Sequence, residues 1–169
     1  MSEIVNRIAN SSIATIDLEE FYPAGDRIVF DLKDYLYMEL VLKEMDFRKA
    51  LKELDWSLYK GKYVAVHCSV DAIVPTWAYM LVTAYLDEVA AAYAVGDKDA
   101  LEQFLFHEAL NKINPDDYVN RPVVVKGCSD VAVPLFAYGE IIRRLKGVAK
   151  SIMFGEPCST VPIYKRSKA

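Results

Sequence analysis

The chain contains few cysteines, histidines and glycines, and each shortage excludes a class of functional site. Its 169 residues include only 3 cysteines and 2 histidines, and they form no C-x-x-C pair of the kind found in zinc sites and redox motifs. The 7 glycines form no Gly-rich loop of the kind that holds a phosphate or a dinucleotide. The sixth residue after Cys68 is Val74, where a cysteine phosphatase needs an arginine, so that class is excluded as well.

The chain also lacks a basic stripe, a signal peptide and an apolar run that would span a membrane. Its 20 basic and 24 acidic residues give a net charge of −4, so nucleic acid is not an expected partner. The first residues, MSEIVNRIANSS, have no uninterrupted apolar core, and the longest apolar-rich stretch carries Asp87 and Glu88. An odd number of cysteines without a signal peptide favours a reducing compartment. We therefore expect a cytoplasmic protein without a membrane partner.

An internal repeat organises the second half of the chain, because residues 63–97 match residues 122–156 at an offset of 59. Eight of the 23 positions from 74 to 96 are identical, and they include a proline and a glycine at the same spacing. The identical pairs are Val74/Val133, Pro75/Pro134, Ala78/Ala137, Tyr79/Tyr138, Leu86/Leu145, Val89/Val148, Ala90/Ala149 and Gly96/Gly155. With a one-residue gap upstream, Cys68 and Ser69 meet Cys128 and Ser129. The repeat predicts a duplicated structural unit.

Each copy of the repeat is predicted to form a strand, a helix and a second strand. YVAVHC and VVVKGC are short β-branched apolar runs, which are typical of buried strands. A proline opens each predicted helix, over residues 75–90 and 134–149, and AAYAV and SIMF are the second strands. The right-handed crossover in such a unit makes its two strands parallel.

The remaining elements are predicted from shorter patterns. DKDALEQFLFHEALNKI is expected to be a helix capped by Asp97 or Asp99, and MDFRKALKELDW a shorter helix. DRIVFDL and LYMELVL are expected to be strands. The prediction is a single α/β domain over residues 1–169, with repeat units 62–97 and 121–156 and an N-terminal addition of strands and a helix over 1–61. Its sheet is expected to be mostly parallel, with helices on both faces.

Each of the three cysteines is followed by a serine and comes at or after the end of a predicted strand, which suggests one shared location. Cys68 and Cys128 follow the first strands of the two repeat units, and Cys158 follows the last predicted strand. Ligands of open parallel sheets bind beyond the carboxyl ends of the strands, where the strand order reverses. If the first strands of the two units are neighbours there, all three thiols approach one crevice.

Three converging thiols predict a metal site as the first hypothesis. Thiolates hold zinc and iron–sulfur clusters, and nearby acids or a histidine would complete the ligand set. The candidate ligands are Cys68, Cys128 and Cys158, with His67, Asp71, Asp130 and Glu156 as possible additions. The hypothesis is thus a binding or assembly protein for zinc or an iron–sulfur cluster. Small buried cysteines that fill tight strand ends are the alternative structural interpretation.

Two further functions stay open at this stage. One is a thiol-dependent enzyme for a small anionic substrate, bound by hydroxyls and helix-start N–H groups at Ser69, Ser129, Ser159 and Thr160. Its weakness is the missing base, because His67 is expected to point away from Cys68 and His107 lies in mid-helix. The other is a non-catalytic homo-oligomeric scaffold, in which the apolar helix 75–90 forms the face of a homodimer.

Three stretches of the chain resemble a known family. They are SEIVNRIANSSIATIDLE, DWSLYKGKYVAVHCSVDAIVPTWAYMLV and VAKSIMFGEPCSTVPIYKR, which together cover the start, the middle and the end of the chain. The family is an uncharacterised bacterial one, domain of unknown function 2480, common in the Bacteroidetes. The resemblance implies a cytoplasmic, stand-alone domain. It brings no activity, cofactor or catalytic residue to this sequence.

Overall fold

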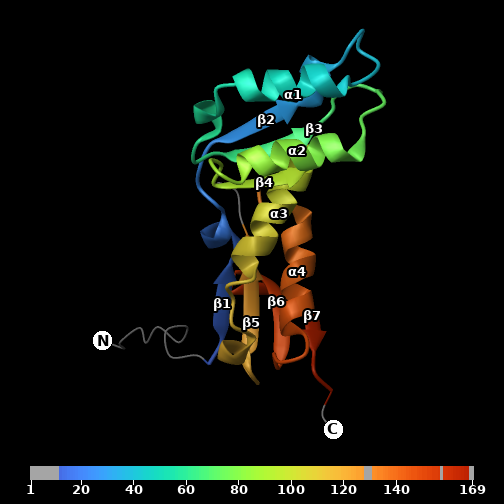
Figure 1. The fold of residues 1–169 in the computed structure, drawn as a ribbon. Coiled ribbons are helices and arrows are strands. Elements are labelled where there is room, and N and C mark those ends of the chain that lie inside the picture. Colours follow the sequence, from blue (N-terminus) through green and yellow to red (C-terminus); the bar gives the residue numbers. More distant parts are fainter. Residues whose placement is uncertain (1–11, 128–130, 157, 168–169) are drawn as a thin grey trace, which may run out of the picture. The chain divides into compact units, whose positions relative to one another are not determined.

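The computed structural model describes residues 12–127, 131–156 and 158–167 and confirms the predicted α/β class with mostly parallel strands (Figure 1). The strands form two sheets where the sequence predicted one. One sheet has the order β1-β5-β6-β7 and the other the order β2-β3-β4. The chain divides into two compact units, which we call unit 1 (Met1–Pro23 and Phe106–Ala169) and unit 2 (Ala24–Leu105).

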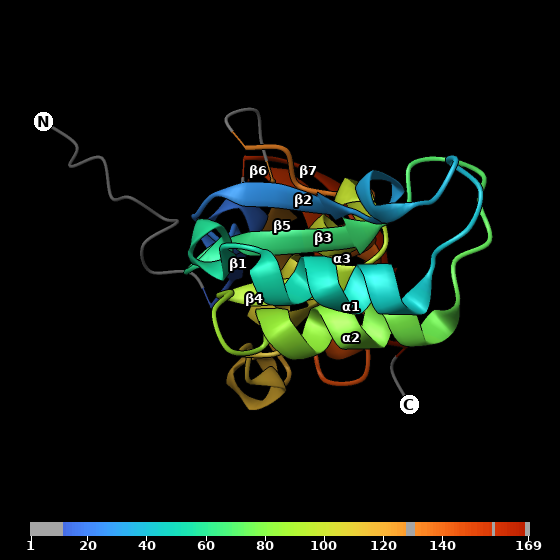
Figure 2. The ribbon, with the colours of Figure 1, turned by 45° about the horizontal axis from the view of Figure 1, so that its top comes forward.

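Unit 2 is a parallel sheet with two helices packed on one face. Its strands are β2 (Arg27–Asp31), β3 (Tyr63–His67) and β4 (Ala92–Val95), and its helices are α1 (Glu44–Glu53) and α2 (Thr76–Leu86). Figure 2 shows the two helices side by side over the sheet, where they bury Phe47, Leu51 and Val82 against Phe30 and Val64.

The other face of the unit 2 sheet is also covered by a helix. Leu101 and Leu105, on the first part of α3 (Lys98–Leu110), pack against Ala65 of β3. The helix is capped by Asp97, whose carboxylate accepts a hydrogen bond of 2.9 Å from the N–H of Ala100. Helices therefore lie on both faces of this sheet, as the alternating strand and helix pattern predicted.

Unit 1 has an equivalent set of three parallel strands and adds a fourth strand. Its parallel strands are β1 (Ala14–Asp17), β5 (Pro122–Lys126) and β6 (Ser151–Glu156), and its helix α4 (Leu135–Leu145) joins β5 to β6. Phe106 and Leu110 of α3 complete the core. The added strand β7 (Ser159–Lys165) pairs antiparallel with the edge of β6. This strand was not predicted, because Pro162 and polar neighbours interrupt the alternation of apolar and polar residues that is typical of a strand.

The duplication is longer than the sequence match suggested. The offset of 59 also relates Phe47 and Leu51 of α1 to Phe106 and Leu110 of α3, and all four side chains are buried. It relates Gly61 (φ 69°) to Asn120 (φ 58°), both left-handed turn residues before the central strand. Each unit is therefore a copy of one strand–helix–strand–helix–strand fold rather than of a single βαβ element.

The strand register corrects the gapped alignment of the cysteines. Tyr63 pairs with Ala92 in unit 2, and the residues 59 positions later, Pro122 and Ser151, pair in unit 1. No gap separates the copies in the central strands, so Gly127 occupies the place equivalent to Cys68. The predicted match of Val64 with Val124 is therefore corrected to Val123, whereas Cys128 lies outside the described residues.

The segment LYMELVL is a turn and not the predicted strand. Met38 (φ 51°) and Glu39 (φ 58°) are left-handed, and Tyr37 and Val41 on either side of them form an isolated antiparallel bridge. A left-handed pair reverses the chain direction, which a continuous strand does not allow. Val41 also bridges Ile73, so this turn is fastened to the loop that precedes α2.

Candidate functional site

The predicted cysteine site depended on β3 and β5 being neighbours, and they belong to different sheets. β3 lies between β2 and β4, and β5 lies between β1 and β6. Cys68 belongs to unit 2 and Cys158 to unit 1, while Cys128 lies outside the described residues with Ser129 and Asp130. Among the residues that the structure describes, no three His, Cys, Asp or Glu side chains are grouped so as to hold a metal ion. Three-thiol ligation stays a prediction, which metal analysis of protein purified without oxygen tests.

In unit 2, the polar groups at the carboxyl edge of the sheet bind one another. The thiol of Cys68 donates to the carbonyl of Val70 over 3.4 Å, and the N–H of Ser69 donates to Asp31 over 3.0 Å. Burial would raise the pKa of Asp31, but hydrogen bonds from Ser69 and Lys33 and the charge of Lys33 together lower it. The hydrogen-bond partners of Asp31 at this edge thus come from the chain itself.

His67 lies on the other side of β3 from the α1 and α2 helices. It is half-buried and lines a shallow hollow of about 300 Å³ with Val29, Asp97 and Lys98, close to the start of α3. Asp71 is exposed in the loop before α2. The structure therefore brings neither residue to the side of the strand on which Cys68 packs.

The predicted residues of unit 1 that the structure describes lie around the turn between β6 and β7. Glu156 and Ser159 pair across this turn, and Cys158 is exposed within it. The hydroxyl of Thr160 donates to the sulfur of Met153 over 3.7 Å. These residues share a turn with one another and not with Cys68.

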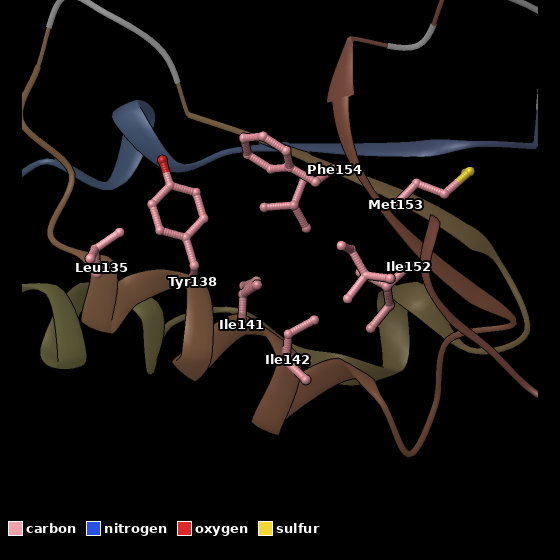
Figure 3. A pocket seen from close by; sticks show the side chains of 9 residues that line it. Leu135, Tyr138, Ile141, Ile142, Ile152, Met153 and Phe154 are labelled. Atoms are coloured by element: carbon pink, nitrogen blue, oxygen red, sulfur yellow. The ribbon is translucent and has the colours of Figure 1, made fainter. Parts of the chain in front are cut away.

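Unit 1 contains an apolar groove, which sequence reasoning missed. Its volume is about 420 Å³, and apolar or aromatic side chains from α4 and from strands β5, β6 and β7 line it (Figure 3). They are Val125, Leu135, Tyr138, Ile141, Ile142, Ile152, Met153, Phe154 and Ile163. Figure 3 shows Tyr138, Ile141 and Ile142 directed from α4 toward Ile152 and Phe154 on the strands. We call this feature the groove.

The groove exists because β7 extends the sheet beyond the helix that covers it. Ile141 and Leu145 are buried over β5 and β6, so α4 lies above these two strands. Ile163 on β7 is 54 % exposed, and Leu135 at the start of α4 is 87 % exposed. The helix and the outer strand thus leave a trough with two apolar sides.

Tyr138 supplies the hydroxyl of the groove lining and closes one end of it. Its ring meets Phe154 edge to face at 5.8 Å, and its hydroxyl donates to the carbonyl of Gly127 over 3.3 Å. A side chain at position 127 would collide with this hydroxyl, which explains the glycine there. The tyrosine is therefore held in place by the strand end as well as by its helix.

A buried charge cluster lies on another side of α4. Glu140 is 2 % exposed, and its carboxylate meets His107 Nδ1 at 2.9 Å as well as Arg143 and Arg144. His107 lies in mid-helix as expected, and its contact with Glu140 links α3 to α4 inside unit 1. One carboxylate here meets two guanidinium groups and an imidazole, so the cluster joins α3 to α4, and none of its residues lines the groove.

The helix expected to form a dimer face packs mainly against its own sheet. Ala78, Val82 and Leu86 of α2 are buried in the unit 2 core, whereas Met80 is 68 % exposed. The homodimer stays a prediction. None of the helices in the described ranges is long and apolar enough to span a membrane.

The groove was detectable from the repeat itself. Aligned at the offset of 59, Leu135 and Ile142 replace Thr76 and Thr83, so unit 1 has apolar residues where unit 2 has hydroxyls. The repeat was predicted from the identical positions alone, so these differences did not enter the prediction. Apolar residues at exposed helix positions, on one copy alone, were the available signal.

Comparisons with known proteins give a family and no activity. No curated protein and no solved structure matched the chain. One family model matches residues 2–166, which is nearly the whole length, and it agrees with the resemblance found in the sequence. The chain therefore belongs to the family described as "Protein of unknown function (DUF2480)".

Proposed function

We propose that this protein is a binding protein that takes a small apolar molecule into the groove of unit 1. The observation that carries the proposal is the groove itself, about 420 Å³ in volume and lined by aliphatic and aromatic side chains of α4, β5, β6 and β7. Small-molecule sites typically occupy about 300–1,000 Å³ and are mostly apolar, with few polar groups. Tyr138 is the one residue of the lining that adds a hydroxyl.

The lining favours binding over catalysis. It contains no carboxylate, imidazole, amine or thiol among its nine described residues, so it offers no acid, base or nucleophile to a bound molecule. The polar clusters around Asp31 and Glu140 are formed by other residues. Apolar contact is thus the interaction that the groove offers.

The expected affinity is weak. Each methylene buried in such a groove contributes about 0.8 kcal/mol, and association costs at least about 4 kcal/mol in lost freedom. A chain or ring system of about ten carbons is then expected to bind with a Kd on the order of 1 mM. Affinity in this range suits reversible uptake and release.

The test is titration with the uncharged fluorescent probe N-phenyl-1-naphthylamine. A Leu135→Thr and Ile142→Thr double variant gives unit 1 the residues of unit 2, and we expect its affinity for the probe to fall about tenfold. Met80→Thr is the matched control, because it removes an exposed apolar side chain of α2 outside the groove and should leave binding unchanged.

A second variant tests the groove independently, in case the Leu135→Thr and Ile142→Thr double variant does not fold. Ile163→Trp fills the groove from the exposed side of β7, and it should also abolish saturable probe binding while the unfolding transition stays intact. Equal probe affinity in the wild type and in all three variants, or no saturable binding to the wild type, would contradict the proposal.

A further inference from the structure

We infer that the ligand of the groove is an anionic amphiphile, whose apolar body fills the groove and whose carboxylate lies beside Lys146. The inference rests on the proposed function and adds the charge and orientation of the ligand. Three observations support it: the position of Lys146 on α4, the lack of a carboxylate partner for it, and the reversal of its charge in the duplicate unit.

The position of Lys146 follows from helix geometry. Tyr138, Ile142 and Lys146 are spaced four residues apart, so they form one stripe along α4 and its C-cap. Tyr138 and Ile142 line the groove, and Lys146 is the next residue of the stripe. Its ammonium lies 5.7 Å from the centroid of the Tyr164 ring, and Tyr164 pairs across the sheet with Ile152 of the groove. The cation is therefore at the end of the groove opposite Tyr138.

Lys146 is available to a ligand. It is exposed, and within the described residues its ammonium meets the Tyr164 ring and no carboxylate. Arg143 and Arg144, its neighbours on α4, are both paired with Glu140. A carboxylate that arrives at this end meets an ammonium group without displacing an internal ion pair.

The surroundings of Lys146 carry the same sign of charge. Lys165 pairs with Ser151 at the start of β6, next to Lys150. The backbone N–H of Arg166 donates to Lys150, and its guanidinium donates to the carbonyl of Gly147, the residue after Lys146. Basic residues at the C-cap of α4, before β6 and at the end of β7 thus gather near Ile152, at one end of the apolar groove. This combination complements a molecule with an apolar body and one anionic end.

The duplicate unit reverses the charge at the equivalent position. Residue 87, which corresponds to Lys146, is an aspartate that accepts a hydrogen bond of 2.9 Å from the hydroxyl of Tyr93. An anionic ligand would be repelled there. The stripe of unit 1 therefore differs from its copy in both polarity and charge, and both differences favour the same class of ligand.

A peptide strand is a less suitable occupant. The outer edge of β7 contains Pro162, which has no N–H to donate to an added strand, and the register shifts between Ile152 and Met153. Lys165 adds a charge to the same edge. These features disfavour the pairing of an added strand with β7. The side of β7 that carries Ile163 and lines the groove remains accessible to a small molecule.

Competition for the bound fluorescent probe tests the inference. Decanoate and 1-decanol have the same chain length and differ in the charge of the head group. We expect decanoate to displace the probe at about fivefold lower concentration than 1-decanol, the gain that one exposed ion pair provides. Lys146→Asp should remove this preference and leave 1-decanol unchanged. Lys60→Asp, an equal change of charge in unit 2, should leave both ligands unchanged.

The outcomes separate the inference from the proposed function. If both ligands compete equally, or if Lys146→Asp weakens both by the same factor, the anionic head group is wrong and apolar binding stands. If neither ligand displaces the probe, the proposed function fails. If vesicles of phosphatidylglycerol bind the protein and decanoate does not compete, the positive end recognises a membrane surface, which overturns the inference of a free amphiphile.

Discussion

The two units share one fold, and two of their differences form the groove: one row of residues on a helix and one added strand. The row in unit 1 is Leu135, Tyr138, Ile142 and Lys146, and the equivalent row in unit 2 is Thr76, Tyr79, Thr83 and Asp87. Two of the buried pairs on the same helices are identical, Ala137/Ala78 and Leu145/Leu86. Packing restricts the core of a duplicated fold, whereas the partly exposed row is less restricted. The apolar row belongs to unit 1.

The second difference is β7, which has no counterpart in unit 2. In unit 2, β4 is the last strand of the sheet and α2 covers the strands beside it. In unit 1, β7 continues the sheet past β6 and supplies Ile163 as the outer side of the groove. The groove thus requires both the apolar row on α4 and the extra strand.

The largest expected effect tests whether the cores of the two units are equivalent. Phe47 and Phe106 are related by the offset of 59 and are 1 % and 0 % exposed. Phe47→Ala and Phe106→Ala should each lower the free energy of unfolding by about 3–5 kcal/mol, because each leaves a cavity in its unit. Urea unfolding measures both. A loss below about 1 kcal/mol for one of them would break the equivalence of the cores.

A smaller loss of stability is expected at position 140, where the cores of the two units differ. Glu140 in unit 1 replaces Leu81 of unit 2 and is paired with His107 and two arginines. Glu140→Gln removes the charge that these cations face, and about 1–2 kcal/mol of stability should be lost, since Arg143 is largely exposed to solvent. Glu108→Gln on the exposed side of α3 is the control. Equal unfolding midpoints for the two variants would refute the stabilising role of the cluster.

The edge of unit 2 should show a dependence on pH that originates from Asp31. Its pKa in the folded state is lowered, so its stabilising contribution is present above the unfolded value of about 4 and is lost as the pH falls through the folded pKa. Wild-type stability should therefore fall more steeply than that of Asp31→Asn as the pH is lowered from about 5 to 3. Thermal unfolding across this range measures the difference. Parallel curves would mean that Ser69 and Lys33 do not stabilise the carboxylate.

The smallest expected effect concerns probe binding by unit 2 after its helix row is changed to that of unit 1. Thr76→Leu and Thr83→Ile give α2 the apolar row of α4, but unit 2 has no strand equivalent to β7. The double variant should gain no saturable binding of the naphthylamine probe. Fluorescence titration checks this, with the groove of unit 1 blocked by Ile163→Trp. New binding of similar affinity would show that the row suffices without the strand.

Local patterns in the sequence predicted the repeated elements. Runs such as YVAVH and PVVVK are strands, the prolines at 75 and 134 precede helices, and Asp97 caps α3 as expected. These features depend on neighbouring residues, so a single sequence contains them. The strand predicted at LYMELVL was wrong, because its apolar residues are typical of a strand while the backbone at Met38 and Glu39 is left-handed.

The division into two sheets was not predictable from the same patterns. It depends on β1 pairing with β5 and β2 pairing with β3, contacts between segments far apart in the sequence. One continuous sheet was assumed, and the convergence of Cys68 with Cys128 followed from that assumption. The groove required β7 as well, whose strand character depends on its pairing with β6. The apolar residues of α4 were visible in the sequence, whereas the side of the groove formed by β7 was recognised only in the structure.

Isoleucine methyl NMR tests the central claim most directly, because the two units carry separate sets of isoleucines. Addition of decanoate should shift the methyl signals of Ile141, Ile142, Ile152 and Ile163, which line the groove. The methyls of Ile28 and Ile73 in unit 2 should stay where they are. Shifts confined to Ile28 and Ile73, or no saturable shift at millimolar decanoate, would contradict an apolar binding site in unit 1.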